Sequence, residues 1–291
     1  MGFQAHFTGS NLLLLWLHMI SEISSKYNSL LKIVRENGEG PIVLINACTH
    51  GHEKIGARVI ETLKSIKLKK GLLITNLANE KAFQVNAAFI ESDLNRIFPG
   101  KIDGTYEEQI AYALHPIIEK VDICIDIHST QTMSVGDGST LIVTKLDDST
   151  IKIINSIKPP RVFLMNVTKG NALISDAKIG IGFEYGRDDE ELHYNYIVRD
   201  IKIILSSMGM IDFMDKGWNF DTKYYEVFDV LRKDELILGT SIENFTLVKK
   251  GDVIGSKNNQ DYQAPFDFIP ILFGPNRYKD IYGFLGKEIK I

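Results

Sequence analysis

The sequence predicts an α/β fold in which helices sandwich a mixed sheet, followed by a small all-β C-terminal domain. Up to about residue 215, apolar runs typical of buried strands alternate with segments that carry apolar residues at helical spacing. After Gly217, short β-type segments are joined by turn residues. Because alternating strands and helices favour a sheet covered on both faces, we expect an α/β domain over residues 1–216. A small β domain is expected over residues 217–291.

Each element of this expectation has its own signal in the sequence. The predicted strands of the first domain are short apolar runs, and they cover residues 41–47, 71–78, 121–129, 139–145, 161–167 and 179–186. The predicted helices repeat apolar residues every three or four positions, and they cover residues 53–66, 106–120 and 189–210. The β-type segments of the second domain cover residues 224–233, 241–256 and 268–274, with a turn at Gly251.

The composition excludes several classes of partner. The chain has 291 residues, and its net charge of −4 provides no basic footprint for nucleic acid or for an anionic membrane surface. The apolar segment 11–20 is about half the length that a bilayer span requires, and no basic residue precedes it. A helix packed on the body of the protein is the expectation for this segment. A small molecule is the expected partner, and a homo-oligomer is left open.

The cysteine content favours a reducing compartment. Cys48 and Cys124 cannot form a disulfide framework, and both lie in apolar runs. We expect two buried free thiols, which are typical of proteins in a reducing environment. The predicted location is the cytoplasm.

Polar residues capable of binding a metal follow the predicted strands, where open α/β sheets place their sites. They are His50, His52 and Glu53 after the first strand, the Asp93, Asn95 and Arg96 segment, His128, and Glu184. Imidazoles and carboxylates that emerge on one edge suit zinc, with one position left open for water. The sequence therefore predicts a metal site at this edge of the sheet.

Spacing separates the candidate ligands from their neighbours. His50 and Glu53 are three residues apart, so a strand-to-helix turn can aim both at one point, whereas His52 should point elsewhere. His128 follows Asp126 by two, so both project to the same face of a strand. Structural alternatives stay open for each, because a single histidine after a strand is often a hydrogen-bonded core residue. Glu53 alone would also suit a helix N-terminus.

The order of motifs THGHE, NEKAF, ESDLNRIFPG, DIHST and FEYG resembles the succinylglutamate desuccinylase and aspartoacylase branch of the zinc carboxypeptidase superfamily. The matching segments run from about Gly40 to Gly186, and the trailing β domain also fits that branch. The resemblance implies a zinc-carboxypeptidase-like sheet. It also implies one zinc ion bound by His50, Glu53 and His128, with water in the fourth position.

The resemblance implies roles for four further residues. Asp93 would orient His50, as carboxylates commonly do for histidine ligands. Asn95 and Arg96 would bind a carboxylate of the substrate, because the guanidinium fork suits a bidentate pair. Glu184 would be the general base that takes a proton from the attacking water and passes it to the leaving amine.

One departure from the family pattern concerns the scissile carbonyl. In the aspartoacylase branch an arginine that polarises this carbonyl lies a few residues before the DLNR motif, and here Ala88 falls at its place. Losing one such donor typically lowers turnover by about 10²–10³. Arg187 and Lys81 are the candidates to replace it, by position only.

A second departure concerns the identity of the substrate. Aspartoacylases carry an arginine upstream of the catalytic glutamate for the second carboxylate of aspartate, and this chain has only Lys169 and Lys178 there. N-acetylaspartate is therefore not the expected substrate. The C-terminal tyrosine that the family places near its site could be Tyr262, Tyr278 or Tyr282.

The leading hypothesis is a zinc-dependent amidohydrolase that deacylates a small N-acyl amino acid or a similar substrate bearing a carboxylate. One alternative is a zinc carboxypeptidase that acts on peptides. Another is a non-catalytic binding protein that retains the metal, which Ala88 keeps open. His115 is expected to be structural and His193 to be solvated, and no G-x-S-x-G motif supports a serine nucleophile.

Overall fold

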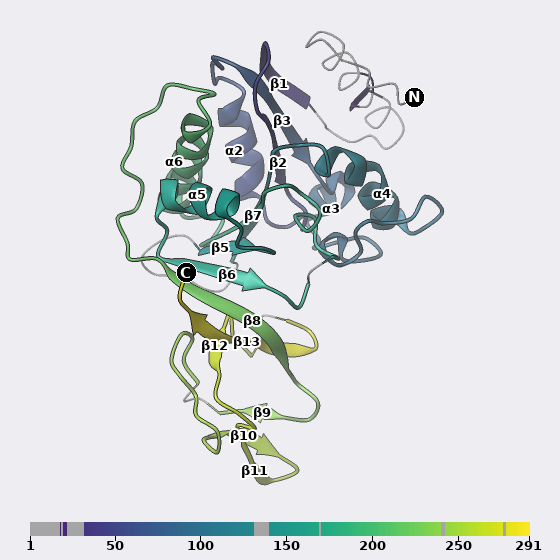
Figure 1. Ribbon diagram of the computed structural model, residues 1–291. Helices are drawn as coiled ribbons and strands as arrows, with labels where there is room; N and C mark the ends of the chain where they lie inside the picture. The colour runs from purple at the N-terminus through teal and green to yellow at the C-terminus, as the bar shows by residue number, and fades with distance from the viewer. Residues whose placement is uncertain are drawn as a thin grey trace, which may run out of the picture.

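The computed structural model describes residues 18, 20–21, 32–130, 140–168, 170–239, 242–275 and 278–291. The expected α/β architecture is confirmed, because a large mixed sheet is covered by helices on both faces (Figure 1). The apolar segment 11–20 lies almost wholly outside the described residues, and so does Lys169. Within the described ranges no helix combines the length and the apolar character needed to cross a membrane.

Ten strands form the main sheet in the order β1-β3-β2-β4-β7-β5-β6-β8-β13-β12. In that order their bounds are Lys32–Asn37, Gly71–Leu77, Ile42–Ala47, Ile123–Ser129, Gly180–Tyr185, Thr140–Val143, Arg161–Met165, Lys223–Arg232, Ile281–Ile289 and Ile269–Ile271. The four strands β3, β2, β4 and β7 are parallel, so their carboxyl ends share one edge. Strand β5 runs antiparallel to β7, which makes the sheet mixed.

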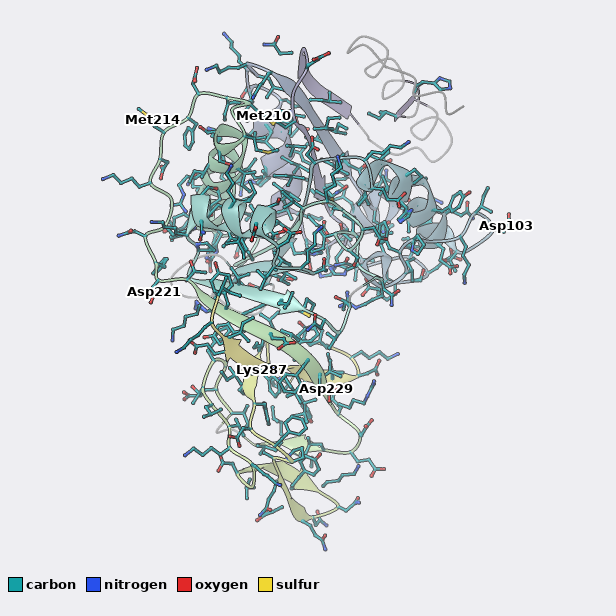
Figure 2. All side chains as sticks on the ribbon, in the orientation of Figure 1. Asp103, Met210, Met214, Asp221, Asp229 and Lys287 are labelled. Carbon is teal, nitrogen blue, oxygen red and sulfur yellow. The ribbon has the colours of Figure 1, made fainter. Side chains whose placement is uncertain are left out.

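Helices cover the two faces of this sheet because its strands are apolar on both sides. Helices α2 (Ile55–Leu63), α5 (Asp148–Ile157) and α6 (Glu191–Ser207) pack on one face with Val43 and Ile45 of β2. Helix α4 (Tyr106–Ile118) packs on the other face with Leu44, and α3 (Glu80–Val85) lies beside it (Figure 1). Side chains fill the interior between these layers, while Asp103 and Met214 project outward at the periphery (Figure 2).

The described residues after 217 form strands and no helix, and strands β8, β10 and β12 overlap the predicted segments, whereas the sequence does not predict β13. Strands β8, β13 and β12 continue the main sheet, whereas β9 (Ile237–Leu238), β10 (Val253–Lys257) and β11 (Gln260–Gln263) form a separate three-stranded sheet. The turn at Gly251 has a φ of +92°, a conformation that favours glycine. The domain boundary at residue 217 stays a prediction.

Candidate metal centre

A tight turn between β2 and α2 brings His50 and Glu53 together. Cys48 starts the turn with a φ of 55°, and the backbone N–H of Glu53 donates to the His50 carbonyl at 3.0 Å. A Cβ on Gly51 would lie 2.1 Å from the Ala82 carbonyl carbon, so only glycine fits there. His50 Nδ1 consequently lies 3.1 Å from Glu53 Oε1.

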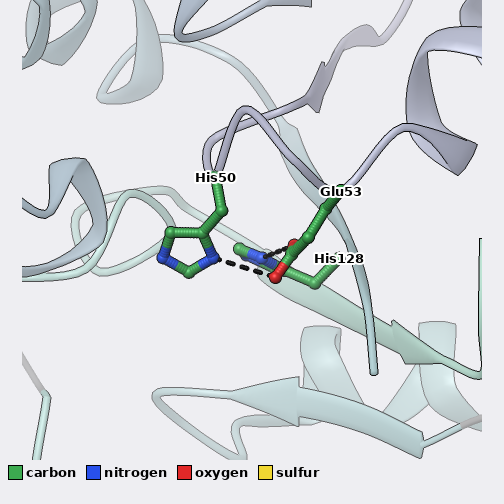
Figure 3. Close-up of side chains that lie close together, drawn as sticks. All are labelled: His50, Glu53 and His128. Atoms are coloured by element: carbon green, nitrogen blue, oxygen red, sulfur yellow. Dashed lines mark hydrogen bonds and ion pairs between the residues drawn. The ribbon is translucent and has the colours of Figure 1, made fainter. Parts of the chain in front are cut away.

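His128 completes the group from the end of β4. Its Nδ1 lies 2.9 Å from Glu53 Oε2, and the His50 and His128 ring centroids are 5.1 Å apart. Figure 3 shows both rings turned toward the Glu53 carboxylate. One ligand atom from each residue lies within 4.8 Å of the others, so these three side chains could hold a metal ion.

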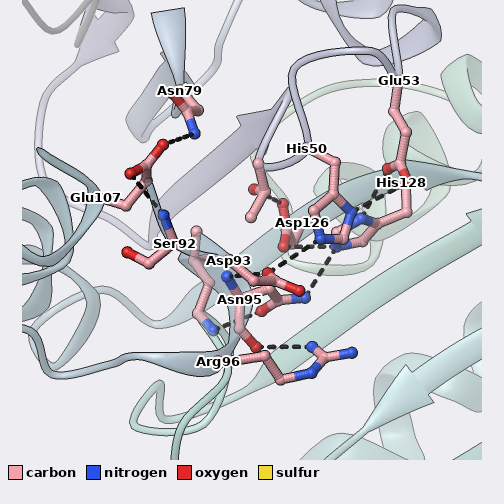
Figure 4. A network of polar contacts seen from close by, with 12 residues as sticks. His50, Glu53, Asn79, Ser92, Asp93, Asn95, Arg96, Glu107, Asp126 and His128 are labelled. Carbon is pink, nitrogen blue, oxygen red and sulfur yellow. Dashed lines mark hydrogen bonds and ion pairs between the residues drawn. The ribbon is translucent and has the colours of Figure 1, made fainter. Parts of the chain in front are cut away.

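Aspartates hold the outer nitrogens of both histidines. His50 Nε2 lies 3.2 Å from Asp93 Oδ1, and His128 Nε2 lies 2.7 Å from Asp126 Oδ2. Thr49 in turn donates to Asp126 Oδ1 at 2.6 Å (Figure 4). An Nε2–H held by a carboxylate leaves the Nδ1 lone pair free to bind a cation, which is a common arrangement of histidine ligands.

The electrostatics of the group favour charged side chains. Burial alone would lower the pKa of His50, but the Glu53 carboxylate and the hydrogen bond to Asp93 raise it to about 9. Burial likewise opposes ionisation of Asp93, yet its bond to His50 lowers its pKa to about 2. The pKa of Glu53 is lowered against burial by the charges of His50 and His128. A cation at this centre competes with the imidazole protons, because a ligating histidine must be neutral.

The short helix η1 (Leu94–Arg96) carries the polar residues beside the group. Asp93 caps it by accepting the Asn95 N–H at 2.9 Å. The Asn95 side chain accepts the Leu173 N–H at 2.9 Å and places Nδ2 3.4 Å from His128 Nε2. Arg96 donates to the Asn95 carbonyl at 2.8 Å and lines the same pocket (Figure 4).

Glu184 reaches the pocket from β7. It is the register partner of His128 on the neighbouring parallel strand, so both side chains project to the same face of the sheet. Glu184 lines a pocket of about 610 Å³ together with His50, Glu53 and His128. The structure therefore brings the three predicted ligands and the predicted base to one cavity.

Comparison with known proteins identifies the family of the chain. Residues 39–211, more than half of the chain, match the succinylglutamate desuccinylase/aspartoacylase catalytic domain. The chain belongs to this family. It is 30% identical over 163 residues to a probable aspartoacylase of a Nostoc species, covering 50% of this chain and 54% of that protein. It is also 31% identical over 104 residues to the N-alpha-acetyl-L-2,4-diaminobutyric acid deacetylase of Halomonas elongata, covering 33% of this chain and 30% of that protein.

The fold is shared with solved members of the desuccinylase/aspartoacylase family. A structure of succinylglutamate desuccinylase/aspartoacylase from Rhodobacter sphaeroides superposes with a TM-score of 0.68 and 21% identity, covering 88% of each chain. The structure of murine aminoacylase 3 gives a TM-score of 0.68 and 17% identity, covering 87% of this chain and 97% of that one. At these identities the likeness concerns the fold alone.

Arg187 and Lys81, the two candidates to replace the arginine missing at Ala88, do not line the pocket. Ala88 lines the pocket, as its position in the family pattern predicts. Arg187 forms a two-pronged pair with Asp189, at 2.9 and 2.7 Å, and Lys81 lies over the Tyr106 ring. Neither cation is among the described residues that line the pocket.

The tyrosines and the bystander histidines are also placed. Tyr278 lines the pocket, whereas Tyr282 donates to the Leu236 carbonyl. His52 lies at the pocket edge, with its ring centroid 6.2 Å from that of His50. The expectation that His193 is solvated is wrong.

His193 is buried because it packs under the turn that follows β7. Its exposed fraction is 2%, and its Nδ1 lies 2.6 Å from Glu190 Oε2. A Cβ on Gly186 would lie 1.9 Å from the imidazole, so the ring fills the space that this glycine leaves. The charged loop before α6 favours an exposed histidine in the sequence. Gly186 is the residue that indicates otherwise, because its missing side chain leaves room for the buried imidazole.

Glu107 is a further residue whose role the sequence does not reveal. It is fully buried in α4, and its carboxylate accepts backbone N–H groups from Ile90, Glu91 and Ser92 at 2.6–3.2 Å. The Asn79 amide donates to the same carboxylate at 3.1 Å (Figure 4). Glu107 thus fixes the loop that leads into Asp93 and η1.

Proposed function

We propose that the chain is a zinc-dependent amidohydrolase that deacylates a small N-acyl amino acid or a similar substrate bearing a carboxylate. The observation that carries this proposal is the convergence of His50, Glu53 and His128 in one pocket with Glu184. The matched regions span only 30% and 54% of the two curated relatives named above, so their activities enter here as support.

The donor set fits the proposed metal. Two imidazole nitrogens and one carboxylate oxygen form a three-ligand set of the kind that catalytic zinc sites use, with a fourth position open. The aspartates behind His50 and His128 fix both rings so that Nδ1 faces the centre. Bound zinc would supply Lewis-acid chemistry, polarising a carbonyl and lowering the pKa of water to about 7.

Asn95 and Arg96 would hold the carboxylate of the substrate. Arg96 is exposed at the pocket and presents a planar fork of donors that matches a carboxylate. The hydrogen bond that the Asn95 side chain accepts from the Leu173 N–H fixes the Asn95 amide beside the metal group. A substrate anchored there would present its amide to the centre formed by His50, Glu53 and His128.

Glu184 would move the proton in the reaction. Its carboxylate would accept a proton from the attacking water as the C–O bond forms. It would then donate that proton to the amide nitrogen as the C–N bond breaks, which yields a carboxylic acid and an amine. A positioned base of this kind typically contributes about 10²–10⁴-fold.

The test compares the wild-type chain with Glu184→Gln on a panel of N-acyl amino acids, with the metal content of both proteins measured. We expect equal zinc content and a loss of at least about 10²-fold in kcat for the variant. Glu191→Gln, an exposed carboxylate on α6, is the matched control and should keep wild-type rates. Equal rates for wild type and Glu184→Gln would rule out the assigned mechanism.

A second candidate function rests on Ala88. The residue lines the pocket where the family pattern has a carbonyl-polarising arginine, so a metal-containing binding protein without catalysis is the alternative. Zinc binding and ligand affinity without hydrolysis of any bound amide would favour it.

A further inference from the structure

The pocket extends well beyond the proposed metal group, across the sheet. Its far side is lined by Ile142 of β5, Met165 at the end of β6, Leu272 just after β12, and Phe284 of β13. We call these four side chains the apolar wall. Tyr278, Lys279 and Asp280, which lie between Leu272 and Phe284 in the sequence, also line this pocket, and the opposite charges of Lys279 and Asp280 add no net charge beside the wall.

The apolar wall belongs to a packed hydrophobic cluster. Met165, Leu272 and Phe284 are each at most 5% exposed, and they pack in one cluster with Phe163 and Val227. Side chains supported in this way keep a fixed shape when a ligand enters. An apolar group that binds against them gains from leaving water without disturbing the core.

Gly182 opens the route from the metal group to the wall. In register it lies between Asp126 of β4 and Ile142 of β5, two residues before Glu184 on the same face. A Cβ at this position would lie 3.3 Å from the Ile142 Cβ. Because Gly182 has no side chain, the surface of the pocket between Glu184 and the apolar wall is not obstructed at this position.

Leu272 is held in a backbone conformation that bulky residues rarely adopt. Its φ is +54°, in the left-handed region, although it is 2% exposed and has a branched side chain. Such conformations are costly and occur most often at functional sites. At this position the backbone directs an apolar side chain to the pocket.

The order of strands places the wall opposite the polar residues. His50 follows β2, while His128 and Glu184 come from β4 and β7 at the centre, and the wall comes from β5, β6, β12 and β13. Asn95 contacts His128 of β4, and none of the wall residues comes from β2, β4 or β7. A substrate anchored by its carboxylate at Asn95 and Arg96 would place its amide at the centre and its acyl group toward the wall.

We propose that the apolar wall binds the aliphatic acyl chain of the substrate. The protein should therefore prefer amino acids that carry an acyl group in the range from butanoyl to octanoyl, and N-acetyl and N-succinyl amino acids should be poorer substrates. This inference rests on the proposed amidohydrolase function for its orientation of the substrate. The wall itself is a feature of the pocket, so its ligand preference can also be measured without turnover.

The first experiment measures kcat/KM for N-acetyl-, N-butanoyl-, N-hexanoyl-, N-octanoyl- and N-succinyl-L-alanine. We expect kcat/KM to rise by up to about fourfold for each methylene that reaches the wall. A rate that is independent of chain length, or highest for succinyl, would overturn the proposal. The proposal would also be overturned if kcat/KM rose with the length of the amino-acid side chain at a constant acyl group but not with the length of the acyl group.

A pair of variants tests whether the wall produces the preference. Leu272→Asn keeps a residue that tolerates the left-handed conformation but makes the wall polar. We expect it to reduce the ratio of octanoyl to acetyl kcat/KM by at least tenfold. Phe245→Asn is the matched control, because Phe245 packs in the same cluster with a φ of 66° but does not line the pocket. An equal change of the ratio in both variants would contradict a role of the wall.

A binding experiment separates this inference from the proposed function. Calorimetry of Glu184→Gln with octanoate, acetate and succinate should give the tightest binding for octanoate, and Leu272→Asn in that background should remove the difference. If no amide is hydrolysed but octanoate binds tightest, the proposed activity fails while the apolar site stands. If amides are hydrolysed but the three acids bind alike, the apolar site fails while the activity stands.

Discussion

At the scale of single residues, the orientation of the two histidines depends on their aspartate partners. Asp126 lies 2.7 Å from His128 Nε2 and is itself held by Thr49. Sequence spacing placed Asp126 and His128 on one face but did not show the contact. The buried pair sets the ring so that Nδ1 faces Glu53.

Replacing Asp126 by asparagine should weaken metal binding. The amide can donate to Nε2 and so favour the wrong tautomer of His128, and loss of such partners typically lowers metal affinity about 10–100-fold. Competition with a chromogenic chelator measures this affinity. Asp176→Asn is the control, because Asp176 makes a similar contact at 3.0 Å to His115, and neither residue is among the described residues that line the pocket. Zinc affinity that is equal in both variants would contradict the role of Asp126.

Asp188 is a second residue that acts at a distance in sequence. Its carboxylate accepts the Lys54 and Ile55 N–H groups at 3.0 and 2.9 Å, at the start of α2 and directly after Glu53. The helix has no capping side chain of its own at this end. Asp188 therefore ties the loop after Glu184 to the segment that carries Glu53.

Asp188→Ala should cost about 1 kcal/mol of folding stability, as the loss of a helix cap does. It should also weaken zinc binding, because the turn that places Glu53 loses its anchor. Asp147→Ala removes the cap of α5, where Asp147 accepts the Thr150 N–H at 2.8 Å, and should cost a similar amount. Urea unfolding and zinc titration of both variants separate the two effects. If Asp188→Ala and Asp147→Ala lost zinc affinity equally, the loss would follow from lower stability, and the role of Asp188 in placing Glu53 would be contradicted.

At the scale of elements, one carboxylate in α4 organises the loop that precedes η1. Glu107 satisfies three consecutive backbone donors in a buried place. In Glu107→Gln an NH₂ group would replace one carboxylate oxygen and face the backbone N–H groups. We expect this to lower the free energy of unfolding by about 1–3 kcal/mol. We also expect a higher KM, since Asn95 and Arg96 follow this loop.

Unfolding in urea and steady-state kinetics check the Glu107 prediction. Glu119→Gln at the exposed end of the same helix is the control and should change neither quantity. A Glu107→Gln protein with unchanged stability would show that the loop does not depend on this carboxylate.

The elements also show what the sequence predicts and what it does not. Strands β2, β4 and β7 could be recognised from apolar runs, and the polar residues after them mark a shared edge. Helix α5 was missed because its run of isoleucines is as typical of strands as of helices. The terminal strand β13 was missed because its stability comes from pairing with β8 over a long sequence separation.

Contacts of the site between residues close in sequence could be predicted from spacing and motifs. Contacts that depend on the order of strands in the sheet could not. His50 and Glu53 share one turn, so their proximity followed from the sequence. The pairing of Glu184 with His128 and the contribution of Phe284 to the pocket depend on which strands are neighbours. Strand order across ten strands is a tertiary property, and no local pattern carries it.

At the scale of the whole molecule, bound zinc should stabilise the fold because its ligands come from distant segments. A ligand present at a hundred times its Kd adds about 2.7 kcal/mol to the free energy of unfolding. For a chain of this size we expect chelation to lower the Tm by roughly 4–5 °C. Differential scanning fluorimetry with and without EDTA measures the shift, which added zinc should reverse. Glu53→Gln should show a much smaller response to EDTA than the wild type.

The most direct test of the account is a crystal structure of the zinc-loaded protein with anomalous data collected on both sides of the zinc absorption edge. We expect one strong anomalous peak about 2.0–2.2 Å from His50 Nδ1, from His128 Nδ1 and from a Glu53 carboxylate oxygen. The Glu184 carboxylate should face that peak across the pocket. A zinc-loaded crystal without a peak between these three side chains, or with its zinc bound elsewhere, would contradict the account.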